Sequence, residues 1–182
     1  ACTNLFKNSG VPQKNIIMVD RTGIIYRGRD GLNQWKSSHA VDTKLRTLDE
    51  AIDGADVFLG LSAKGALSKD MVKKMAKNPI IFACANPDPE IDPVIARKYA
   101  AVVATGRSDH PNQINNVLAF PGIFRGLLDA NAHKITDRLL VAAAVAIADC
   151  VSPSQLNTSF IVPSVFDPNV VTQVAAAVKK SV

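Results

Sequence analysis

Four short apolar runs that alternate with helical segments constrain the fold of this chain more than any other feature. The runs occupy residues 16–20, 56–62, 79–87 and 101–106. Helix-start signals stand between them, at Thr47, at Ser68 and at the beginning of residues 92–100. Apolar strands that are separated by helices pair in parallel, with both faces of the sheet covered. The pattern therefore predicts an α/β fold built on a doubly wound, mostly parallel sheet.

The remaining segments are predicted to be largely helical. Residues 1–9 have the pattern of a helix that ends at Gly10. Beyond residue 106 the apolar spacing predicts three longer helices, over residues 113–129, 136–150 and 168–179. The 182 residues contain no internal repeat or linker, so we expect one domain over residues 1–182. The expected fold is thus a doubly wound sheet followed by C-terminal helices.

The composition excludes several classes of protein. With 47 % hydrophobic and 20 % charged residues, the chain resembles soluble globular proteins. No apolar run reaches the roughly 18 residues that cross a bilayer, so we expect no membrane contact. The net charge is +5, but the basic residues are scattered and not interleaved with aromatic ones, which argues against a nucleic-acid partner. The charge serves either to attract small anions or only to aid solubility. Three cysteines without a pairing pattern indicate a cytoplasmic protein, and no metal-ligand spacing is present.

Asp20 ends the first apolar run, at the edge of a sheet where α/β proteins bind ligands. Its carboxylate can accept hydrogen bonds from the ribose of a dinucleotide, and the simpler alternative is a turn residue. The glycine-rich loop that precedes such a residue by about 20 positions is absent, and counting back places it at or before residue 1. We therefore expect a Rossmann-like domain that lacks its first strand and glycine-rich loop. Arg21, beside Asp20, leaves the choice between NAD and NADP open.

Asn86 follows the third apolar run and is the next candidate. Its amide offers both a donor and an acceptor, which suits a nicotinamide carboxamide or the carboxylate and hydroxyl of a substrate. The alternative is an Asx-turn residue before Pro87. The acidic residues that follow are expected to form the solvated start of a helix, where the helix dipole favours them. They are Asp88, Glu90 and Asp92.

Three asparagines follow the last apolar run, within residues 106–126. Ser108 or Asp109 is predicted to cap a helix there, so the asparagines would lie three and four residues apart on one helix face. Neutral amides at a helix N-terminus suit a carboxylate ligand, because the donors and the dipole both favour it. The alternative is that they are solvated residues of an early helical turn. The three are Asn112, Asn115 and Asn116.

Six segments resemble one known family in their order and spacing. They are IIMVDRTGIIYRGR, ADVFLGLSAKGALSKDMVKKMA, PIIFACANPDPEI, ATGRSDHPNQINNVLAFPGIFRGLLDA, DRLLVAAAVAIAD and FIVPSVFDPNVV. Together they are similar to the NAD(P)-binding C-terminal domain of bacterial-type malic enzyme (malate dehydrogenase, decarboxylating). The resemblance implies oxidative decarboxylation of malate to pyruvate and CO2, with NAD or NADP as cofactor.

The resemblance also implies roles for individual residues. Asp20 would hold the adenosine ribose, and Ser62 with its loop would flank the cofactor. Asn86 would contact nicotinamide and substrate. Asn116, together with Asn115, would bind a malate carboxylate, while the third asparagine would be structural.

Other parts of the family's machinery lie upstream of the matched segments. These are its catalytic Tyr and Lys, its acidic metal ligands and its glycine-rich loop, so we expect no catalytic residue and no metal ligand in this chain. A full-length enzyme would use Mg or Mn, act on the small molecules malate and pyruvate, and form a homodimer or larger homo-oligomer. His110 stands where the family usually has an aromatic residue, often Tyr. Two alternatives stay open: a non-catalytic Rossmann module that senses a nucleotide or dicarboxylate, and another NAD-dependent dehydrogenase on the same fold.

Overall fold

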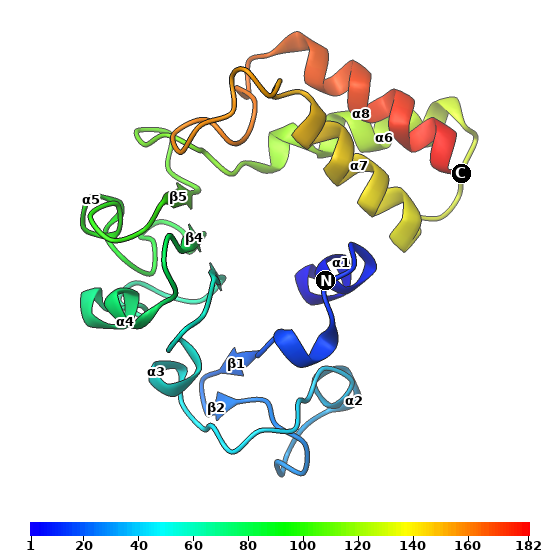
Figure 1. The fold of residues 1–182 in the computed structure, drawn as a ribbon. Helices are drawn as coiled ribbons and strands as arrows, with labels where there is room; N and C mark the ends of the chain where they lie inside the picture. The colour runs from blue at the N-terminus through cyan, green and yellow to red at the C-terminus, as the bar shows by residue number, and fades with distance from the viewer.

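Three parallel strands form the main sheet. In the computed structural model, which describes residues 1–182, they are β3 (Val57–Gly60), β4 (Ile80–Ala83) and β5 (Val102–Thr105). They pair in the order β3-β4-β5, with Val57 opposite Ile80 and Ile80 opposite Val102. The connecting helices α4 (Lys69–Lys74) and α5 (Pro93–Ala96) lie together on the outer side of the sheet (Figure 1). The predicted parallel sheet with flanking helices is confirmed.

The helices near this sheet begin at their predicted caps. Ser68 Oγ accepts a hydrogen bond from the backbone N–H of Met71 at the start of α4, at 3.1 Å. Thr47 and Glu50 form a reciprocal capping box at the start of α3 (Leu48–Ala51). Asp92 accepts the Val94 N–H, at 2.7 Å, and starts α5. These bonds satisfy N–H groups that the first turn of a helix leaves without a partner.

One apolar cluster holds the sheet and these helices together. Ile81 and Ala83 of β4 are fully buried, and Val103 of β5 is nearly so. Removing an isoleucine or valine side chain from water contributes about 1.5–3 kcal/mol, which offsets the cost of ordering the strands. The cluster fixes the carboxyl ends of the three strands relative to one another. Its members are Ile52, Phe58, Leu67, Val72, Met75, Ile81, Ala83, Ile91, Ala96 and Val103.

The first apolar run does not join this sheet, so the prediction of a buried parallel strand over residues 16–20 is wrong. Its end forms β1 (Val19–Asp20), which pairs antiparallel with β2 (Gly23–Ile24). The chain reverses at Arg21 and Thr22, and Gly23 at the start of β2 has a φ of +121° and lacks a Cβ, which would overlap the Arg46 carbonyl oxygen. The Ile24 N–H donates to that same oxygen, at 2.9 Å. A short apolar run before a carboxylate is compatible with either a hairpin or a buried strand, and contacts distant in sequence select the hairpin.

Long helices make up the C-terminal part. They are α6 (Phe120–Asp129), α7 (Asp137–Asp149) and α8 (Pro168–Ser181), with a short 3-10 turn η2 (Asn116–Leu118) before them. A second apolar cluster joins the three helices, with Val174 and Val178 of α8 fully buried. Two of these helices were predicted within two residues at each end. The chain follows an arc, and the N-terminal helix α1 (Cys2–Asn8) packs against α7 of the C-terminal part (Figure 1). None of the helices combines the length and apolar character needed to cross a membrane.

The helix predicted over residues 113–129 begins seven residues later, at Phe120. Residues 112–114 instead run beside β5: the Thr105 N–H donates to the Asn112 carbonyl at 3.3 Å, and the Ile114 N–H donates to the Thr105 carbonyl at 2.8 Å. Pro121 occupies the first turn of α6, where the backbone N–H has no partner within the helix, so proline loses no hydrogen bond there. Both Pro111 and Pro121 suit the first turn of a helix. Because residues 112–114 pair with β5, no helix begins at Pro111.

Candidate functional site

The loops that follow β3, β4 and β5 meet at one edge of the sheet, because the carboxyl ends of parallel strands lie side by side. Ser62 lies two residues beyond β3, and Asn86 lies three residues beyond β4. The segment with the three asparagines follows β5. The structure therefore brings Ser62, Asn86 and this segment to the edge that the sequence predicted.

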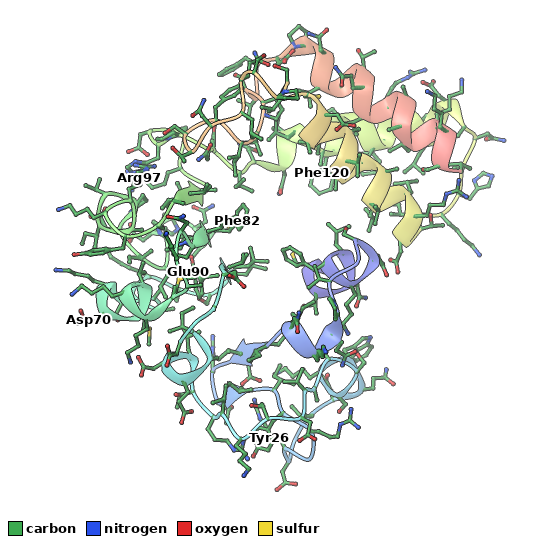
Figure 2. The ribbon with its side chains drawn as sticks, in the orientation of Figure 1. Tyr26, Asp70, Phe82, Glu90, Arg97 and Phe120 are labelled. Atoms are coloured by element: carbon green, nitrogen blue, oxygen red, sulfur yellow. The ribbon has the colours of Figure 1, made fainter.

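Glu90 ties the first two loops together. Its Oε1 accepts hydrogen bonds from the Ser62 N–H at 2.7 Å and from the Ser62 hydroxyl at 3.1 Å. Its Oε2 accepts the Ala85 N–H at 3.1 Å. Glu90 is 0 % exposed, so its expected place in a solvated helix start is wrong. In Figure 2 it lies beside the sheet, whereas Asp70 of α4 lies on the outer side. The missing side chain at Gly60, which makes room for Glu90, is a signal that the sequence analysis did not use.

Asn86 is free to bind a ligand. Its side chain is exposed and makes no hydrogen bond to another protein group, so the Asx-turn alternative is not observed. Its carbonyl carbon is joined to Pro87 by a cis peptide bond. The neighbouring Cys84 is half-buried, and burial, followed by the charge of Glu90, raises the pKa of its thiol to about 11. Cys84 is therefore a neutral thiol near pH 7 and no nucleophile.

The three asparagines differ in their surroundings and do not share a helix face, which corrects the prediction. Asn112 is buried: its amide nitrogen donates to the carbonyls of Val103 at 3.2 Å and Thr158 at 2.9 Å, and its oxygen accepts the Ile161 N–H at 2.9 Å. Asn112 is thus structural, as the family resemblance implied.

Asn115 and Asn116 remain available for a ligand. Asn115 is half-buried and caps η2 by accepting the Val117 N–H at 3.0 Å, which leaves its amide N–H groups free. Asn116 is exposed, with no protein partner for its amide. The predicted cap at Ser108 or Asp109 is wrong, because no helix begins there, and the Asp109 carboxylate instead pairs with Arg107 Nη2 at 2.6 Å. That pair lowers the Asp109 pKa to about 2.

Asp20 is surrounded by cations that lie 9 and 16 residues further along the chain, at Arg29 and Lys36. Arg29 Nη2 contacts both carboxylate oxygens, at 2.8 and 2.9 Å. Lys36 Nζ donates to Oδ2 at 2.6 Å, and the Thr22 N–H donates to Oδ1 at 3.0 Å. The Lys36 bond, opposed by burial and assisted by Arg29, lowers the Asp20 pKa to about 2. Arg21 points to solvent and forms no ion pair.

These contacts limit what Asp20 can accept. Each of its two oxygens already receives two hydrogen bonds, which uses the roughly four lone-pair positions of a carboxylate. A ribose hydroxyl could bind only if one partner moved away. Lys36 is the partner that can move, because its side chain is 42 % exposed and that of Arg29 is 12 % exposed.

The chain offers no metal centre. No group of three or more His, Cys, Asp or Glu side chains is close enough together to hold a metal ion. The acidic side chains near the strand ends are engaged elsewhere: Glu90 by backbone donors, and Asp88 by Lys64 at 3.2 Å. A divalent cation therefore does not fit the residues present at this edge.

Comparison with known proteins identifies the family. Residues 6–182 match the protein family described as "Malic enzyme, NAD binding domain". This chain belongs to that malic enzyme family. Its relatives include the NADP-dependent malic enzyme of Rhizobium meliloti, 52 % identical over 100 % of the chain and 26 % of that protein. The NAD-dependent malic enzyme of Geobacillus stearothermophilus is 51 % identical over 98 % of the chain and 38 % of that protein.

Solved malic enzyme structures share the fold. The enzyme from Entamoeba histolytica matches with a TM-score of 0.91 at 35 % identity, over 98 % of this chain and 39 % of that one. The NAD-dependent enzyme from Thermotoga maritima matches with a TM-score of 0.84 at 43 % identity, over 93 % of this chain and 46 % of that one. The Rossmann-like fold is thereby confirmed. The chain spans about a quarter to a half of the length of these malic enzymes.

Proposed function

We propose that this chain is the cofactor-binding and substrate-binding part of a malic enzyme that converts malate to pyruvate and CO2 with NAD(P)+ and a divalent metal. The observation that carries the proposal is the family match over residues 6–182. The exposed, unpartnered amides of Asn86 and Asn116 at the strand ends support it. Both amides can donate and accept hydrogen bonds, as recognition of a carboxamide or a hydroxy acid requires.

The residues of this chain bind the cofactor and malate and orient them relative to each other. Asn86 contacts the nicotinamide carboxamide and the substrate, and the amides of Asn115 and Asn116 bind a malate carboxylate. Ser62 flanks the cofactor, and Asp20 with Arg21 lies at its adenosine end. The chemistry that a bound NAD(P)+ would supply at these residues is oxidation of C2 of malate by hydride acceptance. None of these side chains is a general base, and the metal does not fit here, so both must come from other residues of the enzyme.

The enzyme is also proposed to be a cytoplasmic homodimer or larger homo-oligomer. Support comes from one face of α6, where Phe120, Phe124 and Leu128 stand four residues apart and are 51 %, 55 % and 74 % exposed. The two phenylalanine rings stack, with centroids 6.0 Å apart, and Phe120 lies on the inner side of the arc (Figure 2). Exposed apolar rows of this kind mark contact surfaces. Sedimentation analysis of the enzyme tests this, and a monomer at micromolar concentration would contradict it.

Malate-dependent formation of NAD(P)H tests the proposed activity. The enzyme that contains this chain is assayed with Mn²⁺, malate and each cofactor in turn, with pyruvate measured as the product. We expect equal amounts of reduced cofactor and pyruvate. Binding of cofactor or malate without turnover would instead favour a non-catalytic module that senses a nucleotide or dicarboxylate. Absence of activity with both cofactors would refute the proposal.

A further inference from the structure

Glu90 is the one ionisable side chain among the buried residues, and no cation neutralises it. A carboxylate is costly to remove from water unless hydrogen bonds replace its hydration. Here those bonds come from the Ser62 N–H, the Ser62 hydroxyl and the Ala85 N–H. All three donors belong to loops at the carboxyl ends of β3 and β4. A buried carboxyl group therefore lies at the point where two candidate binding loops meet.

The main chain of Glu90 holds the first of these loops at its other end. Its carbonyl accepts the Leu67 N–H at 3.2 Å, while its side chain holds Ser62. The segment 62–67 is thus attached to one residue at both ends. On the second loop, the bond to Ala85 lies one residue before Asn86. The position of Ser62 relative to Asn86 depends on Glu90.

Gly60 leaves the room that this arrangement needs. A Cβ built at Gly60 would overlap the Cδ and Oε1 atoms of Glu90. The backbone φ of Gly60 is not in the left-handed region, so conformation alone would permit other residues there. The approach of the carboxylate to the end of β3 therefore requires glycine, independently of the hydrogen bonds.

The donors also explain why the residue must be a carboxylate. An amide of the same length has one acceptor oxygen and one NH₂ group. If the oxygen of a glutamine faced Ser62, its NH₂ group would face the Ala85 N–H, and two donors would oppose each other. If the amide were turned round, its NH₂ group would face the Ser62 N–H. Either way at least one of the Ser62 and Ala85 backbone N–H groups loses its acceptor.

We propose that Glu90 is a positioning residue: it sets the distance between Ser62 and Asn86 so that both can contact one cofactor molecule. This inference rests on the proposed function, since it assumes that these two residues bind cofactor. Glu90 itself is fully buried, and its carboxylate oxygens accept hydrogen bonds from protein donors. Its role is exerted through the two loops.

The test compares Glu90→Gln with Val72→Ala in the enzyme that contains this chain. Val72 is 2 % exposed and belongs to the apolar cluster that holds the sheet together. It makes no hydrogen bond to either loop, so its substitution measures a general loss of stability. Kinetics are measured well below the unfolding temperature of each variant. We expect Glu90→Gln to raise the cofactor KM and to lower kcat, each by about 10-fold to 100-fold, because a binding group would be misplaced. Val72→Ala should lower the unfolding temperature and leave both constants within about twofold.

Two further measurements keep the test decisive. Gly60→Ala displaces the carboxylate without removing it and should reproduce the kinetic change. The amide hydrogen exchange rates of Ser62 and Ala85 show whether the two loops are held, and they do not depend on enzyme activity. At least one of these amides should exchange faster in Glu90→Gln. A variant with a lowered unfolding temperature, unchanged cofactor KM and unchanged exchange at both amides would overturn the inference. An inactive wild-type enzyme would refute the proposed function instead, and the exchange data would then still show whether Glu90 holds the two loops.

Discussion

Asn112→Ala tests how the segment before the candidate substrate amides is held. The substitution removes three hydrogen bonds and leaves the carbonyls of Val103 and Thr158 and the N–H of Ile161 without these partners. At about 1 kcal/mol each, the lost bonds amount to about 3 kcal/mol. Asn112 also has a φ of +57°, which alanine tolerates less well, at a cost of about 1 kcal/mol. We expect the free energy of unfolding to fall by about 4 kcal/mol.

Asn131 supplies a matched control for this prediction. It has a φ of +50°, lies at the surface and makes no side-chain hydrogen bond. Asn131→Ala therefore measures the backbone cost alone, about 1 kcal/mol. Urea denaturation followed by circular dichroism compares the two variants, and Asn112→Gly separates the hydrogen bonds from the backbone cost. Equal losses in Asn112→Ala and Asn131→Ala would refute the reasoning, because they would show that the three buried bonds contribute nothing.

Three further predictions concern the ligand contacts and the charge of Asp20. Asn116→Ala should raise the malate KM by about 5-fold to 150-fold, equivalent to about 1–3 kcal/mol, and change cofactor affinity less; similar losses for both ligands would contradict its assignment. Arg21→Ala should lower kcat/KM for NADP about 10-fold and leave that for NAD nearly unchanged if this guanidinium binds the 2′-phosphate, and an equal effect on both would exclude that role. Because the Asp20 pKa is lowered from 3.8 to about 2, its stabilising contribution is complete above pH 3.8 and is lost as the pH falls toward 2. The stability difference between wild type and Asp20→Asn, measured by thermal unfolding, should therefore shrink over that interval, and a constant difference would argue against the ion pairs.

Local signals in the sequence were sufficient for the elements that depend on near neighbours. Thr47 and Ser68 cap helices because each side chain reaches an N–H three residues away. The alternation of apolar runs and helices predicts parallel pairing because each crossover must return the chain to the same edge. Ser62 and Asn86 were placed correctly at that edge for the same reason. The helix caps, the parallel pairing and the positions of Ser62 and Asn86 all follow from the spacing of residues along the chain.

Elements that depend on distant partners could not be predicted in this way. The start of α6 moves to Phe120 because β5 binds the residues that would otherwise begin the helix. The burial of Asn112 depends on groups that lie 46 and 49 residues further along the chain. Glu90 was grouped with solvated acids because its partners, Ser62 and Gly60, lie about 30 residues earlier. In each case the decisive contact joins segments whose pairing no local pattern reveals.

The Asp20 cluster shows how such distant pairing bears on cofactor choice. Arg29 makes four hydrogen bonds, two to Asp20 and two to the carbonyls of Gly23 and Ile24, and is nearly enclosed. Lys36 makes one and is partly exposed, so it is the partner that a ribose hydroxyl can displace at lower cost. If Asp20 binds the ribose as proposed, displacement of Lys36 would free one acceptor position on its Oδ2 for a ribose hydroxyl. The same step leaves the Lys36 ammonium group unpaired, with a charge that suits the 2′-phosphate of NADP. Under the proposed function, exchange of this one ion pair would therefore let the same site take either cofactor.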